Sequence, residues 1–84
     1  MDSPIESVPS IGKVLGQRLR DVGITTRGEL LAAGDDKAFA LLKHALPEDA
    51  CTHTRLALAG AVRGVHHRDL EPELKSRLTA AMHG

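Results

Sequence analysis

Basic residues gather in one segment of an 84-residue chain whose eleven Lys or Arg residues balance eleven Asp or Glu residues. Residues 12–27 hold one acid, Asp21, and four basic residues: Lys13, Arg18, Arg20 and Arg27. Gly12 precedes the first of these, and backbone N–H groups at the start of a helix bind anions. This pattern predicts a contact with phosphate groups. The candidate residues are Ser10, Ile11, Gly12, Lys13, Gln17, Arg20 and Arg27.

A structural role is the alternative for the same segment. Glycine at position 12 also suits a tight turn, and basic residues often form the solvated face of a helix. If phosphate is bound, a short hairpin contacts the nucleic-acid backbone and not the base edges. Binding would then be weakly sequence-specific and strongly salt-dependent. The sequence leaves both possibilities open.

A second stretch without acids lies between residues 52 and 68. Its basic and imidazole side chains are Arg55, Arg63, Arg68, His53, His66 and His67. If both basic stretches share a face, one duplex would touch both. Because Arg63 and His66 flank Gly64 at the expected end of a helix, we favour a bracing role through hydrogen bonds to helix ends.

Cysteine and histidine are also the residue types that bind zinc. The spacing of Cys51 and His53 is tighter than in usual structural zinc pairs, and adjacent histidines such as His66 and His67 rarely share one ion. As a nucleophile, Cys51 lacks a visible orienting group and oxyanion motif. The sequence contains no P-loop and no dinucleotide fingerprint. We therefore expect no metal, no cofactor and no catalysis, and the lone cysteine favours a reducing, cytoplasmic compartment.

Hydrophobic spacing and turn residues predict five helices and no strands, after a single helical turn in which Ser3 and Glu6 form a capping pair. The expected helices begin at Gly12, at Thr25 or Thr26, at Asp35, at Thr52 or Thr54, and at Pro72. Their expected ends are Gly23, Gly34, Pro47, Gly64 and Met82. These end signals are glycines that adopt left-handed caps and a proline that stops the helix before it.

Aliphatic side chains must fill the core, because Phe39 is the only aromatic residue among Phe, Trp and Tyr. The helix expected after residue 52 is apolar most of the way round between Leu56 and Val62, as a central buried helix would be. Gly60 predicts close packing there. The chain length suits one domain over residues 1–84, and the longest uncharged run, about seven residues, is too short to span a membrane.

Two stretches of the chain resemble known motifs. Val8-Pro9-Ser10-Ile11-Gly12, with the apolar and turn residues that follow it, looks like the hairpin and second helix of the helix-hairpin-helix class. Ser10 stands at the first glycine of that class's Pro-Gly-hydrophobic-Gly core. Residues 56–66, followed by Asp69-Leu70, are similar to the signature of the TfoX C-terminal-domain family. Both stretches occur in order, so the resemblance extends from about Ile5 to Leu78.

This resemblance implies a compact five-helix, SAM-like, all-α domain that contains a helix-hairpin-helix-like motif and is not an enzyme. In longer relatives, such a domain follows an N-terminal domain in regulators of natural competence, and it is described as a DNA-binding or interaction module. The expected partner is the backbone of double-stranded DNA, with no membrane partner. The alternative is a protein partner or a homodimer, bound through a final helix with Leu74, Leu78 and Met82 on one side.

Overall fold

Aliphatic side chains from distant parts of the sequence meet in one core. The computed structural model describes residues 3–83, and its largest fully buried side chains are Ile5, Leu19, Leu30, Leu42 and Leu58. Each comes from a different helical element. Because burying such a side chain contributes about 1.5–3 kcal/mol, this shared core holds the helices together without any large aromatic cluster.

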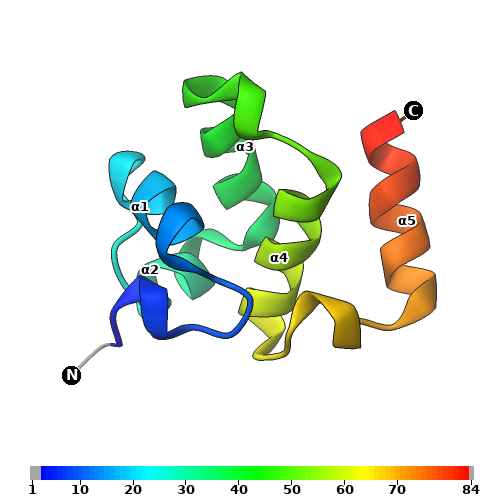
Figure 1. Ribbon diagram of the computed structural model, residues 1–84, viewed down its shortest axis with the longest axis horizontal. Helices are drawn as coiled ribbons and strands as arrows, with labels where there is room; N and C mark the ends of the chain where they lie inside the picture. The colour runs from blue at the N-terminus through cyan, green and yellow to red at the C-terminus, as the bar shows by residue number, and fades with distance from the viewer. Residues whose placement is uncertain (1–2, 84) are drawn as a thin grey trace.

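The elements are five α-helices and three single 3-10 turns, the latter labelled η (Figure 1). In chain order they are η1 (Ile5–Ser7), α1 (Lys13–Asp21), α2 (Arg27–Ala33), α3 (Asp35–Ala45), η2 (Pro47–Asp49), α4 (Thr52–Arg63), η3 (His67–Asp69) and α5 (Pro72–His83). Residues 3–83 contain no strand, and one isolated bridge joins Pro4 to Thr26. The prediction of an all-α fold with five helices is confirmed for this part of the chain.

Local signals place several helix ends where the sequence predicts them. Gly23, just past α1, has φ +90°, and Gly64, the C-cap of α4, has φ +74°. Both values lie in the left-handed region that glycine adopts most easily. At the start of α2 the Thr26 hydroxyl accepts the Glu29 backbone N–H at 3.2 Å, so Thr26 is the cap.

The expected capping pair of Ser3 and Glu6 is wrong. The first 3-10 turn begins at Ile5, Pro4 occupies its N-cap, and no side chain caps it. The Glu6 carboxylate binds the Arg20 guanidinium instead, through two hydrogen bonds. Charge-assisted bonds of this kind are roughly twice as strong as neutral ones, which explains why the Glu6 carboxylate pairs with Arg20.

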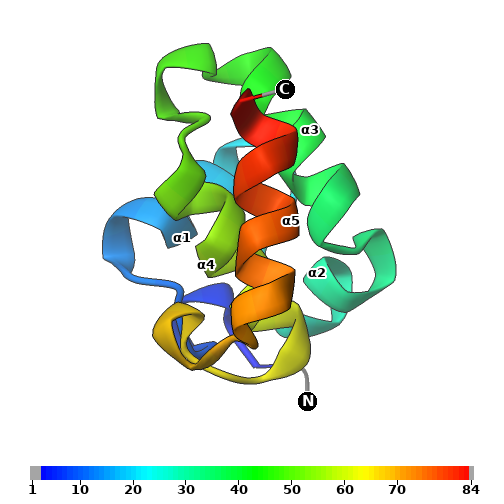
Figure 2. The same ribbon diagram turned by 90° about the vertical axis from the view of Figure 1, so that its right-hand side faces the viewer.

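Helix α4 lies between the N-terminal helices and α5. Its residues 57–61 are all buried, so the prediction of a central helix is confirmed. Figures 1 and 2 show α1 and α5 on opposite sides of α4. None of the α5 side chains that the structure describes is fully buried. Because α4 separates the two helices, α5 does not cover α1.

Candidate phosphate-binding site

A left-handed turn leads into α1. Ser10 has φ +76°, a backbone conformation that favours glycine, and it occupies the position where the helix-hairpin-helix class has its first glycine. Its Oγ donates to the Val65 carbonyl oxygen at 3.0 Å, which ties the turn to the segment after α4. Ile11 is buried in the core, and its backbone N–H donates to Val8 O at 3.1 Å. The turn is thus anchored on both sides of Gly12.

Gly12 is the N-cap of α1 and is exposed. The first helical bond runs from Gly16 N to Gly12 O at 2.8 Å. The N–H groups of residues 13–15 have no acceptor within the helix, and the N-cap has no side chain to cap them. The positive end of the helix dipole points out of the same turn. A cluster of backbone donors at an exposed turn is therefore left without a cap from the helix or from its N-cap residue.

The fold itself does not require glycine at position 12. Its φ of −94° and ψ of −175° are extended values that any residue adopts. A Cβ atom built there would meet no other atom within 4 Å. The missing side chain does, however, allow another molecule to approach the N–H groups closely. Gly12 thus has no function in packing, but it suits close contact with a ligand.

The turn opens into a groove of about 430 Å³ between α1 and the start of α4. Lys13 and Arg18 contribute positive charge to it, and Glu48 contributes one carboxylate. The remaining lining residues are Ser10, Gly12, Val14, Leu15, Cys51, His53, Thr54 and Ala57. Val14 is 66% exposed, so the groove entrance combines open backbone donors, cations and an apolar side chain.

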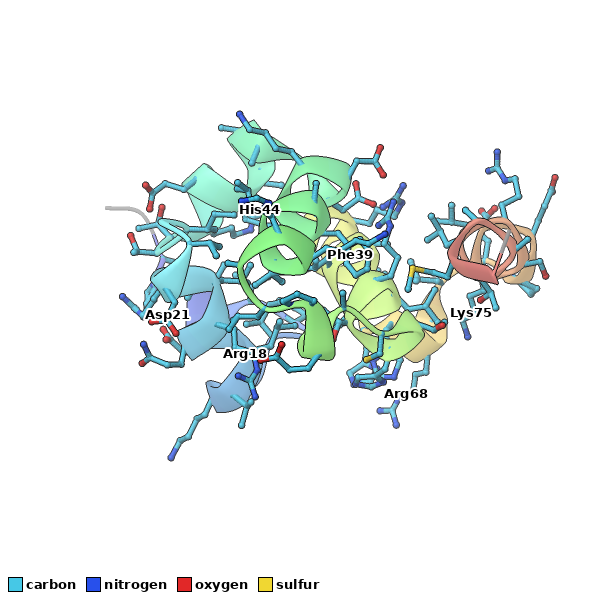
Figure 3. The ribbon with its side chains drawn as sticks, turned by 90° about the horizontal axis from the view of Figure 1, so that it is seen from above. Arg18, Asp21, Phe39, His44, Arg68 and Lys75 are labelled. Carbon is cyan, nitrogen blue, oxygen red and sulfur yellow. The ribbon has the colours of Figure 1, made fainter. Side chains whose placement is uncertain are left out.

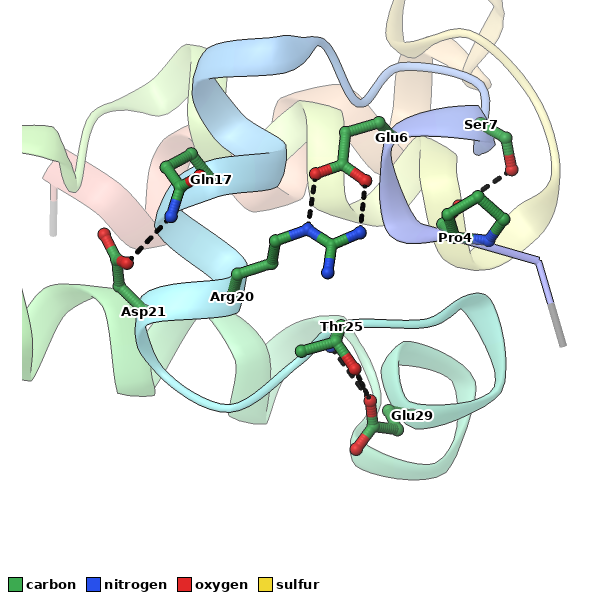
Figure 4. A network of polar contacts seen from close by, with 8 residues as sticks. All are labelled: Pro4, Glu6, Ser7, Gln17, Arg20, Asp21, Thr25 and Glu29. Carbon is green, nitrogen blue, oxygen red and sulfur yellow. Dashed lines mark hydrogen bonds and ion pairs between the residues drawn. The ribbon is translucent and has the colours of Figure 1, made fainter.

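Two of the predicted site residues are bound within the fold (Figure 4). Arg20 Nε and Nη2 donate to the Glu6 carboxylate at 2.6 and 2.7 Å, and this pair lowers the pKa of Glu6 to about 2. Gln17 Nε2 donates to Asp21 Oδ1 at 3.0 Å. Arg27 is exposed at the start of α2 and does not line the Gly12 groove. Among the seven predicted residues, the structure thus brings Ser10, Gly12 and Lys13 together in the groove.

Two arginines of the second basic stretch brace the fold. Arg55 is 8% exposed, and it binds Asp35 at 2.7 Å and also Asp36, both at the start of α3. Arg63 Nη1 donates to Ala59 O at 2.8 Å and lies 3.6 Å from Asp35 Oδ2. The bracing role expected for Arg63 is confirmed. Neither arginine lines the Gly12 groove.

His66 is also used locally. Its Nδ1 accepts the Arg68 backbone N–H at 3.3 Å and caps η3. Arg68 itself is exposed, and Figure 3 shows its side chain and that of Arg18 on the same side of the molecule. Among the arginines of the second basic stretch, Arg68 is therefore the one whose side chain lies on the same side of the molecule as Arg18 of the Gly12 groove.

Cys51 is an exposed thiol at the N-cap of α4. Its Sγ lies 3.4 Å from Thr54 Oγ1, and this hydrogen bond lowers the pKa of the thiol. Among the described residues, no group of three or more His, Cys, Asp or Glu side chains has the arrangement of a metal site. The helices in residues 3–83 also include none with the length and apolar character that crossing a membrane requires.

One comparison with known protein families identifies the family of the chain. Residues 1–82 match the TfoX C-terminal domain. The chain belongs to the TfoX C-terminal domain family. The resemblance drawn from the sequence is therefore confirmed, and this family supports a regulatory, non-catalytic domain.

Two solved structures are similar to this TfoX C-terminal domain. One is an uncharacterised protein from Listeria monocytogenes in a triclinic crystal form, 32% identical, with a TM-score of 0.86 over 98% of this chain and 96% of that one. The other is a Listeria monocytogenes protein of unknown function in a tetragonal form, 34% identical, with a TM-score of 0.83 over 92% and 93%. None of the curated proteins matches the chain. The similarity thus extends over the whole domain.

Several groove residues of this TfoX C-terminal domain escaped the sequence-based prediction. Arg18 was part of the basic segment but not of the candidate site, and Cys51, His53 and Thr54 come from α4. No local spacing rule relates residue 53 to residue 12. The only sequence signal was that the two basic stretches together hold a single acid, Asp21. The helix-hairpin-helix motif stays a prediction, because a single 3-10 turn precedes the Ser10 turn.

Proposed function

We propose that this domain binds the phosphate backbone of double-stranded DNA through the Gly12 turn and the first turn of α1. In this role it would serve a regulator of the natural-competence type that the family resemblance implies. The observation that supports the proposal is the uncapped, exposed start of α1, where neither backbone conformation nor packing calls for glycine. Backbone N–H groups and the helix dipole together favour an anion at such a position.

Cationic side chains around the turn fit the same partner. Lys13 is exposed beside Gly12, and Arg18 lines the same groove. Arg68 projects on the same side of the molecule as Arg18 (Figure 3). Contacts from two or three such groups give affinity without base recognition, so we expect dissociation constants of about 10⁻⁴ to 10⁻⁶ M. Because the chain has no net charge, this local charge must provide the attraction.

Salt-dependent binding of labelled duplex DNA tests the proposal. The affinity should fall as salt rises, with a log–log slope of about −2 to −3 if two or three phosphates are contacted. Lys13→Glu should weaken binding at low salt. Lys37→Glu makes the same change of net charge at an exposed position of α3, and this control variant should bind DNA like the wild type. Equal losses in both variants, or no binding tighter than about 10⁻⁴ M at low salt, would overturn it.

A protein-binding role is the second candidate, and α5 is the observation that favours it. Leu74, Leu78 and Met82 are only half-buried, and together with Phe39 they line shallow grooves between α5 and the rest of the fold. Apolar surface of this kind can bind a helix of another chain. Molecular mass measured over a range of protein concentrations tests self-association: a constant 9.0 kDa would exclude the homodimer.

A further inference from the structure

Three histidine rings lie against one another next to the Gly12 groove. The centroid of the His67 ring is 4.6 Å from that of His53, edge to face, and 4.2 Å from that of His66. His53 is exposed and lines the groove together with Gly12 and Lys13. We call these three rings the imidazole cluster. Its position makes it a neighbour of the proposed DNA contact.

Close packing at Gly60 holds the cluster beside the Ser10 turn. A Cβ atom built on Gly60 would lie 2.9 Å from Ser10 Oγ and 3.1 Å from the His67 backbone N. The Ser10 hydroxyl also bonds to Val65, two residues before His67. The turn that leads into α1 and the imidazole cluster therefore share one rigid support.

Most charged groups that face the cluster are cations. Lys75 of α5 donates through Nζ to the Arg68 carbonyl oxygen at 2.9 Å, which brings a second cation to the rings. No ion pair joins these rings, Arg68 or Lys75 to a carboxylate within the described residues. The titratable and charged groups toward the groove are Lys13 and Arg18 of α1, Glu48 of η2 and the Cys51 thiol.

Proton uptake by His67 is opposed in the isolated protein. Burial lowers the pKa of His67, and repulsion from His66, His53, Lys75 and Arg68 lowers it further. The Nδ1 atom of His67 is buried and has no hydrogen-bond partner. An anion placed against the cluster would offset this repulsion and favour the protonated form of His67.

We propose that the imidazole cluster is a second phosphate contact that operates when His67 is protonated, so that DNA binding strengthens as the pH falls from 8 to 6. This inference rests on the proposed DNA binding. Phosphate bound near a ring raises its pKa, so the complex holds more protons than the free protein. For each pKa unit by which bound phosphate raises the pKa of the ring, the affinity for DNA at low pH increases by up to tenfold relative to the affinity at high pH.

Binding of a labelled duplex of about 20 base pairs, at constant ionic strength and at about pH 8, 7 and 6, tests the inference. All chains carry Cys51→Ser, which removes the titrating thiol from the groove. The test variant is His67→Gln. His44→Gln is the matched control, because His44 is an exposed residue of α3 that lies away from the cluster (Figure 3). Circular dichroism checks folding, and the exposed His53→Gln change, which removes a ring that lies against His67, replaces this variant if it does not fold.

We expect the parent chain and His44→Gln to gain about tenfold in affinity between pH 8 and pH 6, and His67→Gln to lose most of this gain. An equal pH dependence in all three chains would overturn the inference, as would binding that does not vary with pH. A third outcome is that Lys13→Glu weakens DNA binding at pH 8 but the affinity does not increase at pH 6. This outcome would leave the proposed function intact and overturn only the role of the cluster. Absence of binding at every pH would overturn both.

Discussion

Arg20 and Glu6 form a two-point ion pair across the turn that leads into α1. The guanidinium of Arg20 donates to both carboxylate oxygens of Glu6, at 2.6 and 2.7 Å, although the residues are fourteen positions apart. This pair joins η1 to α1, the two elements that flank the Gly12 turn in the sequence. It therefore helps to hold that turn in place. Arg20 was one of the predicted phosphate ligands, but it belongs to the framework that positions the other predicted ligands.

The ion pair makes stability depend on acid pH. Hydrogen bonding to Arg20 lowers the pKa of Glu6 from 4.5 to about 2. A carboxyl with a lowered pKa in the folded state stabilises the protein above its unfolded pKa, and this contribution is lost as the pH falls toward 2. We expect Glu6→Gln to lower the free energy of unfolding at pH 7 and to match the wild type near pH 2. Urea unfolding followed by circular dichroism measures this, and an equal difference at both pH values would contradict it.

Close approach at Gly60 should make even a methyl group costly. A Cβ atom there would lie 2.7 Å from the Val65 carbonyl oxygen, which belongs to backbone and cannot move away cheaply. Gly60→Ala gains up to about 1 kcal/mol in helix propensity but should lose about 1–3 kcal/mol net through overpacking. Thermal unfolding compares it with Gly12→Ala, where space is open. Equal stability of Gly60→Ala and the wild type would show that this contact is not tight.

The buried guanidinium of Arg55 should be important for stability. It is 8% exposed, binds Asp35 and Asp36, and lies 5.8 Å from the centre of the Phe39 ring. Burial tends to raise the pKa of Asp35, but its hydrogen bond to Arg55 and the positive charge keep it below the usual value. Because Arg55→Met leaves Asp35 without this partner, we expect a loss of about 2–4 kcal/mol in denaturant unfolding.

The same substitution at an exposed arginine provides the control for Arg55. Arg68→Met should change the free energy of unfolding by less than about 0.5 kcal/mol, because the Arg68 side chain lies on the surface. Similar losses in both variants would mean that the contacts of Arg55 with α3 contribute little.

A hydroxyl at position 12 should separate stability from binding. In Gly12→Ser, the side chain would accept a backbone N–H of the first turn of α1, as serine does at N-caps. We expect the free energy of unfolding to rise by a few tenths of a kcal/mol, while the affinity for duplex DNA falls because the donors are occupied. Unfolding and DNA titration on the same preparation measure both quantities. Stronger DNA binding by this variant would be inconsistent with phosphate at the Gly12 amides.

Helices and their ends were predictable from the sequence because their signals are local. Leu15, Leu19 and Val22 recur at helical spacing, and Gly23 and Gly64 follow helices at left-handed positions. The contacts of charged side chains were not predictable in the same way. Glu6 looked like a capping residue, and Arg20 looked like a phosphate ligand, until the fold placed the two opposite each other.

The candidate site was predictable in part for the same reason. Gly12 and Lys13 are neighbours in sequence, so their joint exposure at a helix start follows from a short pattern. The contribution of α4 depends on how residues forty positions apart pack together. Cys51 and His53 reach the Gly12 groove only because α4 crosses the core beside α1, which no periodicity indicates.

Backbone amide shifts measured by nuclear magnetic resonance during titration with unlabelled duplex DNA test the central claim most directly. We expect the N–H signals of residues 12–15 to move most, and the shifts to shrink as salt rises, because phosphate would bind at these uncapped donors. Larger shifts on α5 around Leu74 and Leu78, or no shifts at residues 12–15 under conditions where DNA binds, would contradict the claim.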